Sequence, residues 1–278
     1  MIYFLIICLA VAIAIYLYRN NHVIDYTILD LKFKKLPKVF NGTKILQISD
    51  FHNVVYHDNN RDLVANLAKL EPDYIFFTGD AIDSRRLKFA VAYDFFKELI
   101  KIAPVYYVSG NHEGRLNNYD EFHLELNKIG VHVIDNQMVQ LVKNDSVIYL
   151  YGLEDPRRLG KDDDNKNDLL RLKKKLDLFK INTDEFNILL SHRPEQFDLY
   201  RQYPFDLIFS GHAHGGQVRL PLIGGLFAPN QGILPKYTSG IYQNNRAHMV
   251  VNRGLGPSRF PFRINNHPEV ILVNLTNH

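Results

Sequence analysis

Cysteine is almost absent from this chain of 278 residues, which contains a single one, Cys8. Because Cys8 lies in an apolar N-terminal run, the folded part can contain neither a disulfide framework nor a cysteine-based zinc site. Any metal ion must therefore be held by His, Asp, Glu and Asn side chains. This ligand set suits Mn²⁺, Fe or Zn²⁺ better than ions that prefer thiolates.

A strong excess of charge is also missing, since the net charge is only +3. Proteins that bind nucleic acid carry a clustered basic stripe, so we expect no nucleic-acid partner. The chain has no GxxxxGK loop and no GxGxxG motif after a predicted strand, which excludes the two common glycine-rich nucleotide sites. It also lacks the GxSxG turn, which disfavours a serine hydrolase.

An uncharged apolar run, MIYFLIICLAVAIAIYLY, occupies the first 18 residues. At about 1.5 Å per residue, this run is just long enough to cross a hydrocarbon layer of roughly 30 Å. A cleaved signal peptide is the alternative, but the run lacks a basic start and no small-residue cleavage site follows it. We predict a single-pass transmembrane anchor over residues 1–19 and one domain over residues 23–278. Basic residues follow the span, which places that domain on the cytoplasmic face.

The first half of the domain alternates between strand and helix patterns. Short apolar runs such as KILQIS, DYIFFT and PVYYVS each end abruptly in polar residues. Segments with helical spacing of apolar residues lie between them, over residues 61–70 and 87–102. This alternation predicts an α/β architecture with βαβ units. In such sheets, ligands bind beyond the carboxyl ends of the strands, where these polar residues lie.

The second half has a different pattern. Apolar runs at 131–134, 139–142 and 147–151, and the runs HMVVN and EVILVNL near the end, predict antiparallel strands in a second sheet packed on the first. The sum is a β-sandwich flanked by helices. The polar stretch KDDDNKND, residues 161–168, is interpreted as a solvated loop before a helix.

Polar side chains follow five of the apolar runs. In chain order they are Asp50 and His52, Asp80, Asn111 and His112, His192, and finally His212 and His214. Each alone has a structural explanation, because Asp and Asn cap helices and Gly-Asp is a common turn. Together they are oxygen and imidazole ligands that converge only if the strands are neighbours, which indicates a metal centre.

These blocks resemble those of the calcineurin-like metallophosphoesterases. They read D-x-H at 50–52, G-D-x-x-D at 79–83, G-N-H-E at 110–113, a lone His192, and G-H-x-H at 211–214. The segments GHAHGGQVRLP, APNQG and KYTSGIY are similar to small membrane-associated bacterial phosphoesterases, which are related to UDP-2,3-diacylglucosamine hydrolases. The resemblance implies a four-layer α-β-β-α sandwich of two mixed sheets.

The resemblance also implies two divalent metal ions, Mn²⁺, Fe or Zn²⁺. The first is held by Asp50, His52, Asp80 and His214, and the second by Asp80, Asn111, His192 and His212. Asp80 bridges the two, and a metal-bridging hydroxide attacks the phosphorus. We expect the two histidines of G-H-x-H to splay, each facing a different ion.

His112 is expected to be the catalytic proton donor to the leaving group, with Asp83 orienting its ring. The structural alternative for Asp83 is a helix cap. Related phosphatases have Arg directly after this Asp, whereas this chain has Ser84 and then Arg85. The roles of Arg85, Arg86 and Arg193 stay open. Glu113 is expected to accept hydrogen bonds from a turn near the site.

The predicted function is a two-metal phosphohydrolase that cleaves a phosphoester or pyrophosphate, on a lipid-linked substrate at the membrane. The apolar loop 220–230 either packs on the core or exposes Leu222, Ile223, Leu226 and Phe227 as a lip toward lipid. Basic residues over 32–38 near the membrane would support this substrate. The alternatives are a soluble nucleotide or cyclic-nucleotide phosphodiesterase, and a non-catalytic metal-binding scaffold, which the intact ligand set disfavours.

Overall fold

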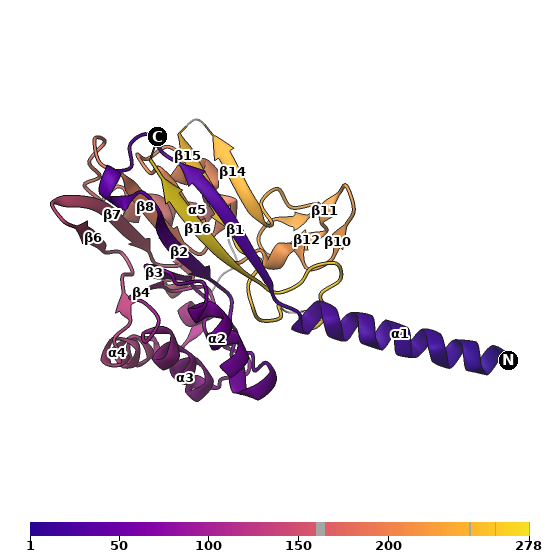
Figure 1. The fold of residues 1–278 in the computed structure, drawn as a ribbon. Coiled ribbons are helices and arrows are strands. Elements are labelled where there is room, and N and C mark those ends of the chain that lie inside the picture. The colour runs from indigo at the N-terminus through magenta and orange to yellow at the C-terminus, as the bar shows by residue number, and fades with distance from the viewer. Residues whose placement is uncertain (160–164, 245, 259, 278) are drawn as a thin grey trace.

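The computed structural model describes residues 1–159, 165–244, 246–258 and 260–277. Two six-stranded sheets pack face to face, and helices cover their outer faces (Figure 1). One long helix projects from this domain. The predicted four-layer α-β-β-α sandwich, preceded by an N-terminal apolar helix, is confirmed.

The first sheet carries three of the five polar strand ends. Its strands are β1 (Asp25–Lys32), β2 (Thr43–Ile48), β3 (Tyr74–Thr78), β4 (Val105–Val108), β5 (His132–Val133) and β16 (Glu269–Thr276). Their order is β1-β16-β2-β3-β4-β5, with β2 through β5 parallel and β16 antiparallel to β2. The carboxyl ends of β2, β3 and β4 therefore meet at one edge of the sheet.

The second sheet carries the other two polar strand ends. Its strands are β6 (Met138–Lys143), β7 (Ser146–Leu153), β8 (Asn187–Ser191), β9 (Leu207–Ser210), β14 (Gly240–Asn244) and β15 (Ala247–Val251). They lie in the order β14-β15-β9-β8-β7-β6, and only the two outermost pairs are antiparallel.

The prediction of an antiparallel second sheet is therefore wrong in two respects. The central strands β7, β8, β9 and β15 run parallel, and the runs at 131–134 and EVILVNL form β5 and β16 of the first sheet. Apolar runs of this kind show that a strand is buried but not which neighbour it pairs with. The long connections that contain helices allow the chain to return parallel.

Helices form the two outer layers. The first sheet is covered by α2 (Arg61–Ala68), α3 (Phe89–Leu99) and α4 (Tyr119–Ile129), and the second by α5 (Asn165–Leu176) and α6 (Phe197–Tyr200). The predicted helices at 61–70 and 87–102 are confirmed, with slightly shorter ends. Successive residues of β3 face opposite sides: Phe76 packs between the sheets, whereas Phe77 packs against α3. Each buried ring contributes roughly 1.5–3 kcal/mol.

Part of the acidic stretch 161–168 lies outside the described residues. The helix α5 begins at Asn165, and Asp168 is 2% exposed, with a carboxylate oxygen 3.9 Å from Nε of Arg157. The solvated-loop interpretation is wrong for Asp168. Asp168 lies inside α5, where its carboxylate faces Arg157 and the domain. The acidic residues next to it in the sequence do not indicate that this one side chain is buried.

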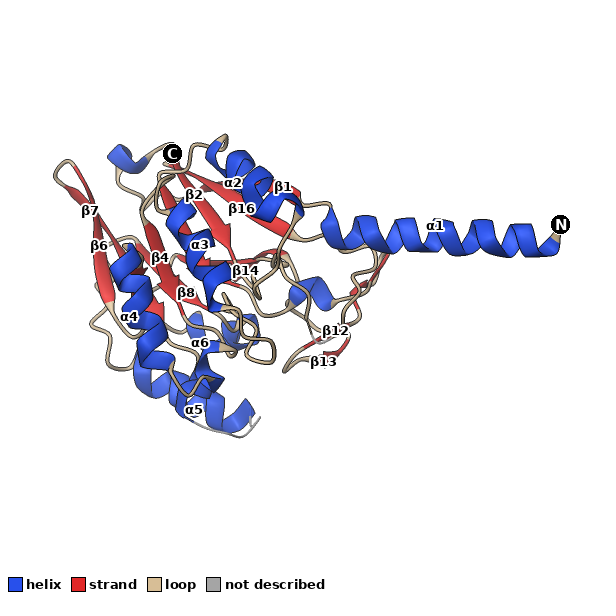
Figure 2. Ribbon diagram, turned by 90° about the horizontal axis from the view of Figure 1, so that it is seen from below, coloured by secondary structure: helices blue, strands red, loops and turns tan. Residues whose placement is uncertain are grey.

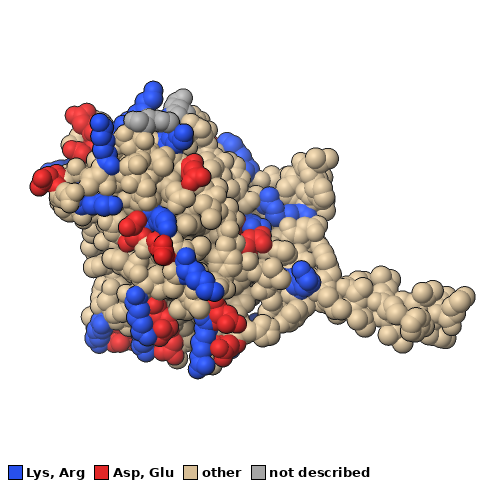
Figure 3. All heavy atoms as spheres, viewed as in Figure 1, with Lys and Arg blue, Asp and Glu red and all other residues tan. Residues whose placement is uncertain are grey.

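The N-terminal helix α1 (Ile2–His22) is long and apolar enough to cross a membrane. Figure 3 shows most of its length free of acidic and basic side chains, whereas charges of both signs cover the domain face in view. Only Val23 and Ile24 separate α1 from β1, so the connection between the helix and the domain is short. The domain must stay close to the end of this helix.

The expected basic patch near the membrane is wrong. The strand β1 leaves the base of α1 and runs to the opposite end of the domain (Figure 1). Its eight residues carry Lys32 and the basic residues after it roughly 25 Å from the helix, at 3.3 Å per residue. Lys35 pairs there with Asp206 of the second sheet, 3.2 Å away. Closeness in sequence to α1 did not mean closeness in space.

The loop after G-H-x-H folds as two small hairpins beside the base of α1 (Figure 2). The first joins β10 (Arg219–Leu220) to β11 (Gly224–Gly225), and the second joins β12 (Phe227–Ala228) to β13 (Gly232–Ile233). Leu222 is fully exposed, and Ile223 and Phe227 are more than half exposed. These three residues form the apolar lip. The alternative in which the whole loop packs on the core is excluded, although Leu226 is partly buried.

Candidate metal centre

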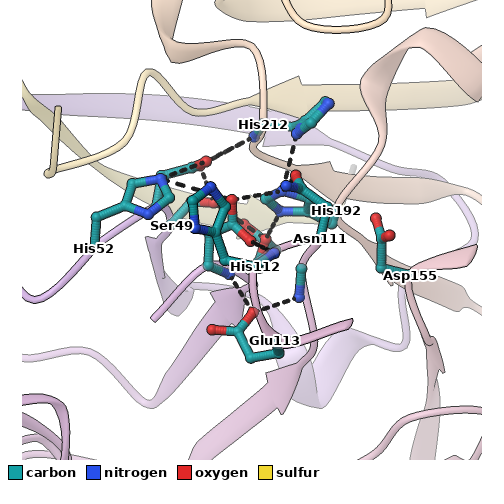
Figure 4. A network of polar contacts seen from close by, with 12 residues as sticks. Ser49, His52, Asn111, His112, Glu113, Asp155, His192 and His212 are labelled. Atoms are coloured by element: carbon teal, nitrogen blue, oxygen red, sulfur yellow. Dashed lines mark hydrogen bonds and ion pairs between the residues drawn. The ribbon is translucent and has the colours of Figure 1, made fainter. Parts of the chain in front are cut away.

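The five polar strand ends converge where the carboxyl edges of the two sheets meet (Figure 4). Asp50 and His52 follow β2, Asp80 follows β3, Asn111 and His112 follow β4, His192 follows β8, and His212 and His214 follow β9. The seven predicted ligands are each 6% exposed or less. Parallel neighbours in each sheet, and the face-to-face packing of the sheets, bring these residues together.

A first group of side chains consists of Asp50, His52 and His214, whose potential ligand atoms lie within 4.8 Å of one another. Nε2 of His214 is 3.2 Å from Oδ1 of Asp50 and 3.3 Å from Nε2 of His52. The two imidazole rings stack, with centroids 5.1 Å apart. Three ligand atoms thus face one small volume.

A second group consists of Asp80, His192 and His212, which meet the same 4.8 Å limit. Nε2 of His192 is 3.3 Å from both Oδ2 of Asp80 and Oδ1 of Asn111, and 3.1 Å from Nδ1 of His212. Oδ2 of Asp80 is also 3.6 Å from Nε2 of His52. The Asp80 carboxylate therefore lies between the two groups.

Hydrogen bonds on the outer ring nitrogens fix which nitrogen faces the centre. Nδ1 of His192 lies 2.7 Å from the carbonyl of Thr78 and Nδ1 of His52 lies 3.3 Å from that of Ile82. A carbonyl can only accept, so Nδ1 of both rings carries a proton and Nε2 is the nitrogen that faces the centre. Both Nε2 atoms face carboxylate oxygens, an arrangement that fits divalent cations between them once Nε2 is deprotonated.

The two histidines of G-H-x-H have opposite ring orientations. His214 directs Nε2 at Asp50, whereas His212 directs Nδ1 at His192. Nε2 of His212 lies 3.0 Å from Oδ1 of Asn230, which holds the proton on that nitrogen. The backbone φ angles of 65° and 46° at His212 and His214 lie in the left-handed region, which separates the two rings.

Left-handed backbone recurs at Asp50, His52 and Asp80, with φ of 49°, 49° and 54°. Such conformations cost about 1–3 kcal/mol each and cluster at functional sites. The glycines permit the close approach that this requires. A Cβ on Gly211 would lie 1.8 Å from Oγ of Ser49, and one on Gly110 would lie 2.2 Å from Oδ1 of Asp80.

Three groups contact Nδ1 of His112 on the cavity wall. Oδ1 of Asp83 lies 3.3 Å away, the backbone N–H of Ser84 donates to the same nitrogen at 3.0 Å, and Oγ of Ser84 lies 3.2 Å away. The Asp83 carboxylate can only accept and the Ser84 N–H can only donate, so these two groups compete for Nδ1. Asp83 also binds Nε of Arg85 at 2.9 Å. Since the next helix starts at Phe89 with Lys88 as its N-cap, Asp83 is not a helix cap.

The expected role of Glu113 is confirmed. Its carboxylate accepts hydrogen bonds from the backbone N–H groups of Asp80, Ile82 and Gly110, at 2.8–3.1 Å. This carboxylate fixes the loops after β3 and β4 relative to one another. Burial and the charge of Asp80 raise the pKa of Glu113 to about 7.

Arg193, left open by the sequence, is buried and points away from solvent. Its guanidinium forms two bonds to Asp155, at 2.5 and 3.0 Å, and one to Oδ1 of Asn230 at 2.8 Å. Asn230 in turn holds His212. Arg193 therefore positions a candidate ligand through Asn230. The segment APNQG, which contains Asn230, carried the family resemblance but did not predict this contact.

The centre opens into a cavity of about 900 Å³. Sequence reasoning did not assign several of its lining residues, namely Ser84, Arg115, Arg157, Asn230 and Ser258. Arg85, also undecided, lines it as well. Phe227 of the apolar lip forms part of the rim. The arginines and the aromatic ring in its lining suit an anion that carries an apolar group.

Electrostatic coupling within the centre is strong. Burial, with further help from His112, lowers the pKa of His52 to about 3. Burial alone would lower the pKa of His192, but the carboxylates of Asp80 and Asp50 outweigh it and raise this pKa to about 10. Burial opposes ionisation of Asp50, yet His214 holds the pKa of that carboxyl below its usual range. Without a bound cation, the positive charge of the protonated His192 ring compensates the negative charge of the Asp80 and Asp50 carboxylates.

Comparisons with known proteins agree with this geometry. A family model described as calcineurin-like phosphoesterase matches residues 43–216. YkuE of Bacillus subtilis (strain 168), named an uncharacterized metallophosphoesterase, is 32% identical over 268 residues, which cover 93% of this chain and 87% of YkuE. Phosphodiesterase YaeI of Escherichia coli (strain K12) is 28% identical, over 84% of this chain and 82% of YaeI.

One relative from a vertebrate is named a transmembrane protein. A Danio rerio protein named transmembrane protein with metallophosphoesterase domain is 25% identical over 88% of this chain and 56% of its own length. The family match covers all five strand ends that build the site. The chain therefore belongs to the calcineurin-like phosphoesterase family and is a metallophosphoesterase.

Proposed function

We propose that this protein is a two-metal phosphohydrolase that cleaves a phosphoester or pyrophosphate bond of a lipid-linked substrate at the membrane. The observation that carries the two-metal part is the Asp80 carboxylate, which lies 3.6 Å from His52 of the first group and 3.3 Å from His192 of the second. Both contacts are made by Oδ2, whereas Oδ1 accepts the backbone N–H of His112 at 2.8 Å. A carboxylate oxygen has two lone pairs and can bind two cations at once.

The proposed ligands divide between two metal ions. One ion is held by Asp50, His52, Asp80 and His214, and the other by Asp80, Asn111, His192 and His212. The neutral amide of Asn111 and the neutral imidazoles keep the negative charge of the centre low enough to admit an anionic phosphate. When bound, the two ions clamp phosphate oxygens and activate a water.

His112 supplies the proton for the leaving group. Its ring lies on the cavity wall, with Nδ1 at 3.3 Å from Oδ1 of Asp83, which orients the ring. Nε2 donates its proton to the leaving oxygen, and the N–H at Nδ1 stays hydrogen-bonded to Asp83.

Metal binding is expected to release protons, because ligands must be deprotonated to bind metal. Asp80 and Asp50 raise the pKa of His192 to about 10 in the metal-free protein, so His192 is protonated at pH 7.5. Calorimetric titrations of Mn²⁺ in buffers of different ionisation enthalpy should detect about one proton released at this group. The metal affinity should rise with pH up to about 10. A pH-independent affinity between pH 7 and 9 would contradict the assignment of His192.

The lipid-linked substrate is supported by the position of the cavity. Phe227 belongs to both the cavity rim and the apolar lip. The lip lies beside the base of α1, on the side of the domain from which the apolar helix leaves (Figure 1). An exposed apolar edge next to a membrane span suits contact with the lipid surface. Basic residues after the span support a cytoplasmic position of the domain.

Replacing two lip residues should separate lipid-linked from soluble substrates. We expect Leu222→Ser/Ile223→Ser to lower kcat/KM about tenfold on a lipid-linked pyrophosphate or phosphodiester in vesicles, because the variant loses lipid contact of about 1.5 kcal/mol. Activity on bis-p-nitrophenyl phosphate should not change. Leu178→Ser, an exposed leucine after α5, is the control. Equal activity of the parent on soluble nucleotides and lipid-linked substrates would instead favour the soluble-substrate alternative.

A further inference from the structure

The C-terminal end of α1 is polar and docks on the domain. Asn20 and Asn21 direct their amide N–H groups back to the helix carbonyls of Tyr16 and Leu17, at 2.9 and 2.7 Å. Their amide oxygens are left to face outward, toward the segment 263–266 that lies beside the base of α1 (Figure 1). Asn20 is only 4% exposed, which is unusual on a helix whose other residues are almost all exposed.

Asn21 connects this helix to the backbone around Asp50 and His52. Its Oδ1 accepts the backbone N–H of Arg263 at 3.2 Å. The buried guanidinium of Arg263 donates to the carbonyls of residues 253, 254 and 256, at 2.7–3.0 Å. That segment packs directly on the first group: a Cβ on Gly254 would lie 2.6 Å from Cβ of Asp50.

Asn20 connects the helix to the turn that carries His214. Its Oδ1 accepts the backbone N–H of Asn266 at 3.4 Å. The fully buried side chain of Asn266 donates to the carbonyls of His214 and Gln217, at 2.8 and 3.1 Å. Its Oδ1 lies against Gly215, where a Cβ would approach to 2.1 Å. Asn266 therefore sets the shape of the turn that orients the His214 ring.

Both connections end at the first group of ligands. The second group is held by other contacts, from the carbonyl of Thr78 to His192 and from Asn230 to His212. We propose that Asn20 and Asn21, at the end of the membrane helix, are positioning residues that hold the first metal position in shape through Asn266 and Arg263. This inference rests on the proposed two-metal function and assigns the anchor helix a part in it.

The test measures metal affinity in full-length protein in detergent micelles, where each metal position can be isolated. In a His192→Ala background only the first position is complete, and in a His52→Ala background only the second. Adding Asn20→Ala/Asn21→Ala should weaken Mn²⁺ binding about tenfold in the first background, as loss of contacts that orient ligands does. In the second background the same change should have no effect.

Two further variants keep the result interpretable. Asn266→Ala, on the domain side of the contact, should reproduce the effect of the double change at α1. Tyr16→Phe removes another hydrogen bond between α1 and the domain, to Oδ1 of Asn265, and should leave both affinities unchanged. Equal weakening in both backgrounds, or weakening in neither, would overturn the inference. If His192→Ala and His52→Ala each bind as many ions as the parent, the proposed two-metal function itself fails.

Discussion

Asp80→Asn is expected to bind fewer metal ions and to lose phosphodiesterase activity by about 10³-fold or more. Metal ions stabilise the transition state by several kcal/mol, and 10³-fold corresponds to about 4 kcal/mol. Asp80 lies between both ligand groups, at 3.6 Å from His52 and 3.3 Å from His192, so an amide there removes the shared negative charge. The measurement is kcat/KM on bis-p-nitrophenyl phosphate together with metal content.

Asparagine is the right replacement at this position because the backbone of Asp80 has a φ of 54°. Asparagine tolerates left-handed backbone far better than alanine, so the change should leave the fold intact. Asp94→Asn, an exposed carboxylate that pairs with Lys97 on α3, is the matched control and should behave as the parent. A fully active Asp80→Asn protein would show that this carboxylate does not bridge two ions.

His112→Ala is expected to keep both metal ions and to lose turnover, by about 10²–10⁴-fold in kcat, the usual contribution of a general acid. The alternative is that His112 is itself a metal ligand, because potential ligand atoms of His52, Asp80 and His112 lie within 4.8 Å of one another. Metal content separates the two roles: a proton donor can be removed without loss of metal, whereas a ligand cannot. The loss should be smallest on substrates with an acidic leaving group, which needs no proton.

Two companion variants define the role of His112 further. Asp83→Asn removes the charge 3.3 Å from Nδ1 and should lower kcat less than His112→Ala, because the ring remains. His132→Ala, an exposed histidine in β5, should change neither kcat nor metal content. Loss of one metal ion from His112→Ala would reassign His112 as a ligand and refute the proton-donor role.

The residues of the metal centre were predictable because each follows an apolar run that could only be a buried strand. Asp50 and Asp80 stand at strand ends, where α/β sheets bind ligands. The residues that hold the candidate ligands in place were not predictable. Asn230 and Asp155, which hold His212 and Arg193 in place, belong to loops whose contacts depend on the final packing of both sheets.

The sheet topology and the charge near the membrane were predicted less well, for a shared reason. The hydrophobic pattern shows which segments are buried, but not in which direction a strand runs or how far it carries the chain. We therefore predicted that the runs forming β5 and β16 belong to the second sheet, and that Lys32 lies close to the membrane. The strand β1, which follows α1, carries the chain to the far end of the domain within eight residues.

The most direct test of this account is the number and coupling of metal ions in the reconstituted protein. Full-length protein saturated with Mn²⁺ should hold two ions per chain, and its electron paramagnetic resonance spectrum should show exchange coupling between ions about 3.5–4 Å apart. Asp80→Asn should abolish that coupling. Saturation at one ion per chain, or two ions without coupling, would contradict a centre built around a bridging Asp80.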